Sequence, residues 1–242
     1  MSLVCSVLVA GAAVLLKPIQ ETNKQANVKV NILSVAGLLE VGAKVDELFR
    51  RIEPKVVDLN TGEYATDIDP ATYDMRKATQ DPTLSAPVPA EKDIASIKRR
   101  PQYATVYRVK DGERLKLIIL PIKGYGLWST LYGFLALEPD LKTVHGINFY
   151  EHAETPGLGA EVQNPKWVSQ WQGKVVYDEH GAPVIDIVKG TVDKQDPESI
   201  YKVESISGAT LTSQGVENML RYWLGPEGFG PYIQKLQAQQ KG

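Results

Sequence analysis

Residues 103–120 read YATVYRVKDGERLKLIIL, two strand-like runs on either side of the pair Asp111-Gly112. Runs rich in β-branched and aromatic residues around an Asp-Gly pair are typical of a β-hairpin. Short connections of this kind favour antiparallel pairing of the strands that they join. The stretch therefore predicts a hairpin within an antiparallel or mixed sheet.

Four more strand-like runs follow, and most are joined by short turns. They are LYGFLAL (131–137), KTVHGINFY (142–150), KVVYD (174–178) and VIDIV (184–188). Residues 164–171 predict a short helix. A longer helix begins near Leu211, where apolar residues recur on one face as far as Leu224, and Gly225 and Pro226 end it. The expected fold class is α+β, a mostly antiparallel or mixed sheet with packed helices.

The part of the chain before the hairpin is less regular. Apolar residues at intervals of three and four predict a helix over residues 38–52, which Pro54 ends. Residues 53–100 contain many turn-forming residues and predict a loop-rich region. Residues 17–35 predict a polar stalk that is compatible with a helix.

The first residues are strongly apolar. Residues 3–16, LVCSVLVAGAAVLL, carry no charge, although a membrane span needs about 20 residues. Three interpretations stay open: the core of a signal peptide, a buried strand or helix, and a single transmembrane helix. We expect the last, which divides the chain into an anchor at 1–17, a helical stalk with a loop-rich part at 18–100, and a folded domain at 101–242.

Composition and motifs exclude several kinds of site. The 242 residues have a net charge of −2 and no basic stripe, so nucleic acid is not expected as a partner. The single cysteine, Cys5, excludes an internal disulfide, a zinc site of several thiolates and an iron–sulfur cluster held by this chain alone. His152 and Glu154 lack the cysteines of a zinc deaminase, and no metalloprotease, nucleophile-elbow or P-loop motif occurs. We expect no catalytic residue and no metal site.

Three clusters of small residues remain to be explained: LPIKGYGLWST (120–130), EHAETPGLGAE (151–161) and ESISGATLTS (204–213). Each has an ordinary interpretation, namely a turn whose Trp128 packs into the core, a connecting loop, and a helix start capped by a hydroxyl. The third has an alternative. Free N–H groups at a helix start favour a phosphate, and Gly208 and Ala209 allow close approach of the backbone while Thr210 supplies a hydroxyl.

The third cluster resembles the flavinylation motif D-x-x-[ST]-G-A-[TS], whose last residue carries FMN through its phosphate. Residues 207–210 match this motif, and Glu204 stands where aspartate is usual. The other two clusters and the apolar start of the chain resemble the C subunit of the sodium-translocating NADH:quinone reductase. This similarity covers nearly the whole chain and includes the FMN-binding domain, expected at 101–242.

The resemblance implies a covalent FMN, joined as a phosphoester to Thr210. In that family a separate flavin transferase attaches FMN from FAD with the help of Mg²⁺. Trp128 and Leu158 are expected to flank the isoalloxazine ring, with Ser129 and Thr155 as polar neighbours. The full set of implied FMN contacts is Thr210, Ser207, Gly208, Ala209, Leu211, Thr212, Trp128, Ser129, Thr155, Leu158 and Gly159.

The resemblance also implies an electron carrier in a complex of the bacterial inner membrane. That complex moves electrons from NADH to ubiquinone and exports sodium, with the NADH, quinone and sodium sites on other subunits. A single-pass anchor would hold the soluble domain on the periplasmic side. Two alternatives stay open: the G subunit of the related Rnf complex, which also binds FMN, and a membrane-anchored binding or scaffold domain without a cofactor.

Overall fold

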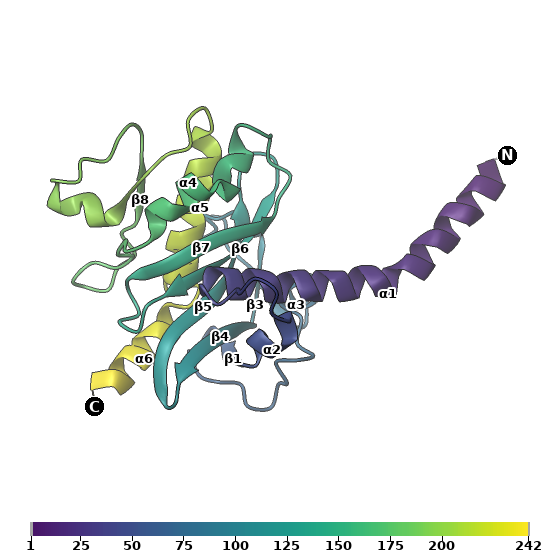
Figure 1. Cartoon of the computed structure of the whole chain (residues 1–242), viewed down its shortest axis with the longest axis horizontal. Helices are drawn as coiled ribbons and strands as arrows, with labels where there is room; N and C mark the ends of the chain where they lie inside the picture. Colours follow the sequence, from purple (N-terminus) through teal and green to yellow (C-terminus); the bar gives the residue numbers. More distant parts are fainter. Residues whose placement is uncertain (1, 242) are drawn as a thin grey trace.

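The computed structural model describes residues 2–241, which form a central sheet with helices on both faces (Figure 1). The helices are α1 (Ser2–Val35), α2 (Val45–Phe49), α3 (Met75–Gln80), α4 (Pro165–Val168), α5 (Thr210–Leu224) and α6 (Gly230–Lys241), with short 3₁₀ helices at Gly159–Gln163, Ser169–Trp171 and Pro197–Tyr201. The strands are β1 (Ile52–Asp58), β2 (Ser85–Pro87), β3 (Arg99–Pro101), β4 (Tyr103–Asp111), β5 (Arg114–Tyr125), β6 (Thr130–Leu137), β7 (Val144–Glu151), β8 (Asp186–Val188) and β9 (Lys202–Glu204).

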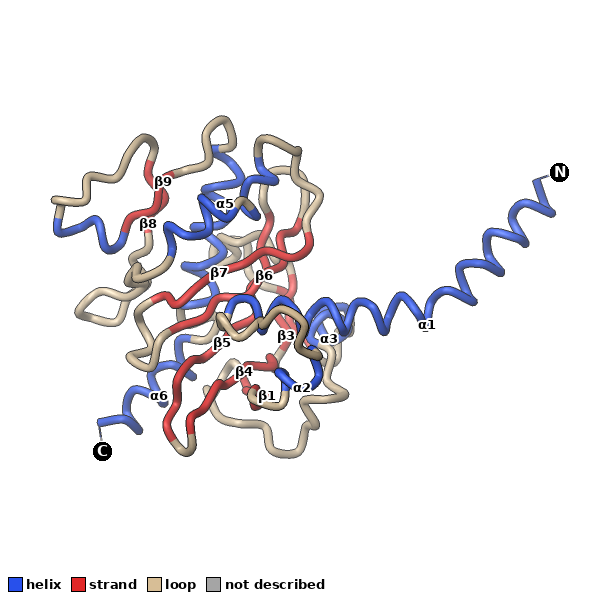
Figure 2. Tube along the Cα trace, viewed as in Figure 1, coloured by secondary structure: helices blue, strands red, loops and turns tan. Residues whose placement is uncertain are grey.

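The central sheet is antiparallel, with the strand order β1-β4-β5-β6-β7. Its middle is the predicted hairpin, in which Asp111 pairs with Arg114. Gly112 in the turn has a φ of +58°, a left-handed conformation that glycine adopts without steric cost. The predicted α+β class with mostly antiparallel pairing is confirmed. Two small sheets flank it, β2-β3 antiparallel and β8-β9 parallel (Figure 2).

The sheet separates two hydrophobic cores. Along β5, Ile118, Leu120 and Ile122 belong to the core on the α5 side. Leu117 and Ile119 belong to the core beneath α1. A strand that is covered on both faces reads as a continuous apolar run, which explains the sequence RLKLIIL.

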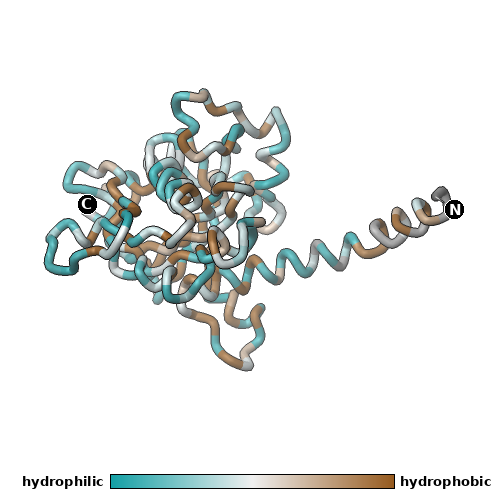
Figure 3. The backbone as a smooth tube through the Cα atoms, turned by 90° about the horizontal axis from the view of Figure 1, so that it is seen from above, coloured by the Kyte–Doolittle hydropathy of each residue, from teal (hydrophilic) through white to brown (hydrophobic). Residues whose placement is uncertain are grey.

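Only the C-terminal part of α1 lies on the sheet, where it packs against β6 and β7 (Figure 1). Ile32 and Leu33 are fully buried there, and Val28 packs at the edge of the same core. Val9 and Val14 near the other end are exposed. Figure 3 shows the hydrophobic colour gathered toward the N-terminal end of this helix, with a largely hydrophilic stretch before the body. The helix therefore has an apolar outer part and a polar stalk.

Within residues 2–241, no single helix is both long and apolar enough to cross a membrane. Two parts of α1, Cys5–Pro18 and Thr22–Val35, satisfy length and composition together but are bent by 44°. Pro18 lies at the bend and has no N–H for the helical hydrogen bond. The Thr22 hydroxyl donates to the Pro18 carbonyl at 3.0 Å. The expected transmembrane anchor is therefore not established by the fold.

The predicted helix over residues 38–52 is wrong for most of its length. Only α2 is helical, and Ile52 is the first residue of β1, where it pairs with Val109. Gly42 has a φ of +82°, which interrupts a right-handed helix, and Val41 is fully exposed. The apolar spacing in this region therefore comes from two separate elements.

Two other sequence-based expectations need correction. Residues 53–100 are largely loop but contain β1, α3, β2 and β3, and the Asp74 carboxylate caps α3 by accepting from the N–H groups of Arg76 and Lys77. KVVYD forms isolated bridges at Val175 and Tyr177 rather than a regular strand. Part of VIDIV pairs in parallel with β9, because the chain returns beside it after a long connection. The short helix predicted at 164–171 is present as α4 and the 3₁₀ turn that follows it.

The last helix, α6, was not predicted. It packs against the turn that follows β1. A side chain at Gly62, where φ is +71°, would lie 2.5 Å from the backbone carbon of Pro231. The hydroxyls of Tyr64 and Tyr232 are 2.9 Å apart. The turn after β1 can therefore lie so close only because it carries glycine.

Candidate functional site

The N-terminus of α5 carries no side-chain cap. Its N-cap is Ala209, whose methyl group accepts no hydrogen bond. None of the described residues supplies an acceptor to the backbone N–H groups of Thr210, Leu211 and Thr212. Thr210 and Leu211 are exposed and Thr212 is buried, so the Thr210 hydroxyl lies at the accessible start of the helix. The interpretation of this cluster as a hydroxyl-capped helix start is therefore wrong.

Ser213 explains how the chain turns into the helix without such a cap. Its hydroxyl accepts from the Ile206 N–H at 3.0 Å and donates to the Ala209 carbonyl at 3.0 Å. Gly208, between them, has a φ of +73°, which a residue with a side chain rarely adopts. Ser213 is buried, whereas Ser207 and Gly208 are exposed. The turn is therefore closed from inside the protein, and its outer side stays open.

The end of β5 and the loop at 126–129, between β5 and β6, lie directly against α5. A side chain at Gly215 would collide with the Tyr125 carbonyl, and one at Gly124 would lie 2.7 Å from the Met219 Cβ. Glycine at these two positions lets the helix approach the backbone at the end of β5. The first and third small-residue clusters are therefore neighbours in the structure.

Glu154 connects all three clusters. Its Oε1 accepts from the N–H groups of Trp128 and Ser129, both at 3.0 Å, and from the Ser129 hydroxyl at 3.1 Å. Its Oε2 accepts from the Thr212 hydroxyl at 2.8 Å and from the Leu127 N–H at 3.3 Å. Burial raises the pKa of Glu154, but these hydrogen bonds outweigh it and leave the pKa below its usual value. The carboxylate is therefore ionised at neutral pH.

Glycines on both sides of Glu154 make room for this carboxylate. A side chain at Gly126 would lie 2.7 Å from Oε1 of Glu154. One at Gly159 would lie 2.6 Å from Oε2 and 2.6 Å from the Thr212 hydroxyl. The small residues of the first two clusters are therefore required where the loops close around the carboxylate.

Large apolar side chains surround the exposed turn. Trp128 is 66% exposed, so the interpretation in which it packs into the core is wrong. Leu158 is 44% exposed and Leu211 57% exposed. The Leu158 side chain lies against Gly208, where an added Cβ would be 3.0 Å from Cδ2. Exposed apolar groups beside free N–H groups and a hydroxyl suit a flat aromatic ligand that carries a phosphate.

The residues expected around the cofactor have different surroundings. Thr210, Leu211, Ser207 and Gly208 are exposed on the turn, while Ala209 and Thr212 are buried behind it. Across from them lie two loops, one with Trp128 and Ser129 and one with Thr155, Leu158 and Gly159. Ser129 is half-buried, and its hydroxyl accepts from the Ala153 N–H at 2.8 Å as well as donating to Glu154. Thr155 is exposed, and its carbonyl accepts from the N–H groups of Leu158 and Ala160.

Glu154 was missed as a site residue, because sequence reasoning considered it only as part of a metal-binding spacing with His152. No local signal in the sequence identifies it, because its hydrogen-bond donors Ser129 and Thr212 lie far away in the chain.

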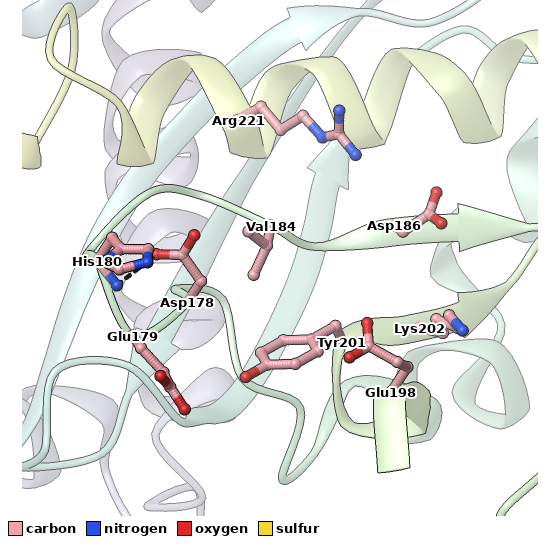
Figure 4. Close-up of a pocket in the computed structure, with 9 residues that line it drawn as sticks. All are labelled: Asp178, Glu179, His180, Val184, Asp186, Glu198, Tyr201, Lys202 and Arg221. Atoms are coloured by element: carbon pink, nitrogen blue, oxygen red, sulfur yellow. Dashed lines mark hydrogen bonds between the residues drawn. The ribbon is translucent and has the colours of Figure 1, made fainter. Parts of the chain in front are cut away.

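A separate open cavity of about 410 Å³ lies beyond β8 and β9 (Figure 4). It is lined by Asp178, Glu179, His180, Val184, Asp186, Glu198, Tyr201, Lys202 and Arg221. Asp178 accepts there from the N–H groups of its own turn, and Lys202 and Arg221 pair with Asp196 and Glu217. Since both of its basic side chains are already paired with carboxylates, it is a weaker candidate for an anionic ligand than the α5 site.

The candidate site on α5 lies inside a region that matches a known domain family. A family model described as FMN-binding domain matches residues 126–225, a range that begins at the Trp128 loop and includes all of α5. The C subunit of the Na(+)-translocating NADH-quinone reductase from Pseudomonas aeruginosa is 52% identical over 238 residues, which cover 97% of this chain and 91% of the relative. The protein of the same name from Yersinia pestis is 47% identical, and the match covers 97% of this chain and 88% of that relative.

Solved structures show the same fold. The crystal structure of Shewanella oneidensis NqrC superposes with a TM-score of 0.82 at 36% identity, covering 90% of this chain and 99% of that one. The C subunit of the Na(+)-translocating NADH-quinone reductase from Parabacteroides distasonis gives a TM-score of 0.67 at 24% identity, covering 91% and 96%, and shares the fold.

Proposed function

This chain belongs to the family of C subunits of the Na(+)-translocating NADH-quinone reductase, and from that membership we propose that it carries FMN covalently on Thr210. It is an electron-transfer subunit of a sodium-pumping NADH:quinone reductase, and it acts within that complex rather than alone. The family assignment favours this function over the G subunit of the Rnf complex and over a domain without a cofactor.

The observation that supports the covalent bond is the uncapped start of α5. The exposed Thr210 hydroxyl lies beside N–H groups that have no acceptor among the described residues. After the bond forms, the phosphoester keeps one negative charge, and the positive end of the helix dipole stabilises it. The turn at Ser207 and Gly208 leaves the outer side free for the phosphate.

Attachment is a phosphoryl transfer from FAD catalysed by a separate flavin transferase. The Thr210 oxygen forms the new bond to the phosphorus of the FMN half, and the bond to the AMP half breaks. AMP leaves, and the hydroxyl proton is released with it. The chain therefore gains the mass of FMN minus one water.

Apolar side chains at the site would hold the ring. FMN supplies reversible uptake and release of electrons when it is bound. Trp128 and Leu158 offer exposed apolar surface on two loops that face the turn, with Ser129 and Thr155 as polar neighbours. Leu211, on the first turn of α5, adds a third apolar side chain. Their exposure also leaves the ring accessible to a redox partner.

In the same proposal the chain has three regions. Residues 1–17 anchor it in the bacterial inner membrane as a single pass, 18–100 form the stalk and loop-rich part, and 101–242 carry the flavin. Strand β1 joins the second region to the third because it pairs with β4. The flavin domain faces the periplasm, and the NADH, quinone and sodium sites lie on other subunits.

The test is the intact mass of the denatured full-length chain after production together with the transferase. We expect the wild type to show the FMN adduct and a yellow colour that survives denaturation, and Thr210→Ala to show neither. Ser207→Ala, which removes the neighbouring exposed hydroxyl, should keep the adduct, and Thr210→Ser should keep it in part. Because Thr210 is not the N-cap, Thr210→Ala should cost less than the roughly 1 kcal/mol of a lost cap. An adduct on denatured Thr210→Ala would exclude the assignment.

A further inference from the structure

Glu154 is a buried carboxylate without a basic partner. The residue is only 5% exposed, and no lysine, arginine or histidine side chain within residues 2–241 forms an ion pair with it. Five hydrogen bonds occupy its two oxygens instead, three from backbone N–H groups and two from hydroxyls. A buried charge without a counter-charge is costly, so a protein keeps one where it has a specific effect.

We propose that Glu154 is the positioning residue of the flavin site, and that its fixed negative charge lowers the reduction potential of the flavin. This inference rests on the proposed function, since it concerns the same FMN on Thr210. It assigns to Glu154 two separate effects, one through geometry and one through charge.

The geometric effect follows from what the carboxylate joins. One oxygen holds the backbone of Trp128 and Ser129, and the other holds Thr212, two residues after the acceptor threonine. Glu154 itself begins the loop that carries Leu158. The three apolar side chains around the turn therefore depend on a single carboxylate for their relative placement.

The residues packed around Glu154 leave its carboxylate little freedom to take another position. Gly126 and Gly159 both approach its oxygens so closely that an added Cβ would lie under 3 Å away. The Ser129 hydroxyl, which donates to Oε1, also accepts from the Ala153 N–H, so the loop is held at two points. Replacing the whole Glu154 side chain by the methyl group of alanine would leave five hydrogen-bond donors without this acceptor in a buried place.

The charge effect follows from electrostatics. A negative charge in a low-dielectric place raises the energy of any nearby group that gains an electron. The carboxylate also uses the N–H groups of Trp128 and Ser129, which are then not available to stabilise electron density on a ring beside Trp128. Both features make reduction of the flavin less favourable.

Three variants of the flavinylated full-length chain separate the two effects. Glu154→Gln keeps the shape and an oxygen for Trp128 and Ser129 but removes the charge, so the midpoint potential should shift to a more positive value. Thr212→Val removes one hydrogen-bond donor to Glu154 and leaves the negative charge of the carboxylate less compensated. The midpoint potential should therefore shift to a more negative value. Glu154→Ala should lower the yield of covalent flavin and change its visible circular dichroism.

Glu151→Gln is the matched control, because Glu151 lies three residues away, is half-exposed and is paired with Arg76. A shift in Glu154→Gln no larger than that in Glu151→Gln, with full flavin yield and an unchanged dichroism spectrum in Glu154→Ala, overturns the inference. If thermal denaturation shows that Glu154→Gln is poorly folded, the test of the charge effect is the sign of the change in midpoint potential in Thr212→Val. A change to a more positive value in that variant contradicts the charge effect. A wild type without covalent flavin contradicts the proposed function, whereas a loaded wild type with unresponsive variants contradicts only the role of Glu154.

Discussion

Lys123 is a cation held in an unfavourable place. It lies near the end of β5 beside Arg76 of α3, and its Nζ donates to the Thr79 hydroxyl at 3.1 Å. Burial and then repulsion by Arg76 lower its pKa from 10.5 to about 8. The folded chain therefore releases this proton at lower pH than the unfolded chain does.

The lowered pKa of Lys123 makes the free energy of unfolding increase with pH. Between about pH 8 and 10 the unfolded state binds more protons at Lys123, so the free energy of unfolding rises with pH by at most about 1.4 kcal/mol per pH unit. Lys123→Met should be more stable than the wild type at pH 7, and the difference should shrink as the pH rises to 10. Urea denaturation at several pH values measures it. A difference that stays constant across this range would show that Lys123 keeps its ordinary pKa.

At this scale the sequence predicts Thr210 as the acceptor because its motif is contiguous, and this assignment stays a prediction. The sequence did not indicate that Glu154 joins the three clusters, because its donors Ser129 and Thr212 are 25 and 58 residues away in the chain. A glutamate in a polar loop looks solvent-exposed until the fold places N–H groups around it. The exposure of Trp128 was hidden for the same reason, since a lone tryptophan is more often buried.

Among the elements, α1 stabilises the fold through its C-terminal half, which packs on the sheet. Leu33 is fully buried between this helix and the sheet, in the core that includes Ile119 and Phe134. Leu33→Ala should lower the free energy of unfolding by roughly 2–5 kcal/mol, because the cavity is only partly refilled. Chemical denaturation measures the change.

Leu39→Ala is its matched control, with the same loss of atoms at a position that is 48% exposed. It should change stability by no more than about 0.5 kcal/mol. Equal effects of the two substitutions would mean that α1 does not pack on the sheet as described.

Elements with local signals were predicted well. The β4-β5 hairpin and α5 each combine a periodic run with a turn or stop residue inside one short window. Strand β1 and helix α6 lacked such a signal, because β1 carries Pro54 and α6 is mostly polar. Both are held by partners far away in the sequence, which is why sequence patterns alone did not indicate them.

For the molecule as a whole, neither core includes a described side chain from the outer half of α1. A chain that lacks residues 2–18 should therefore keep its fold, because Val28 is the first described side chain that packs against a core. If the apolar outer half is the anchor, this truncated chain should leave the membrane fraction and appear in the soluble fraction, while the full-length chain stays with the membranes. Fractionation followed by denaturation of both chains makes the comparison.

The proposed covalent flavin on Thr210 provides the control in that experiment, since Thr210 lies far from the truncated segment in the chain. The truncated chain should take up as much FMN as the full-length chain when it reaches the same transferase. A truncated chain that still sediments with membranes, in the absence of other subunits, would locate the membrane attachment elsewhere.

The contact between Gly62 and Pro231 has a consequence for biosynthesis. The turn after β1 is closed by residues near the end of the chain, and the core beneath α5 includes Tyr232 and Ile233 of α6. A nascent polypeptide that has emerged only as far as Thr210 lacks both. On the proposed assignment of Thr210 as the acceptor, its hydroxyl should reach its folded setting only after α6 has left the ribosome, so we expect flavin attachment to follow translation rather than accompany it.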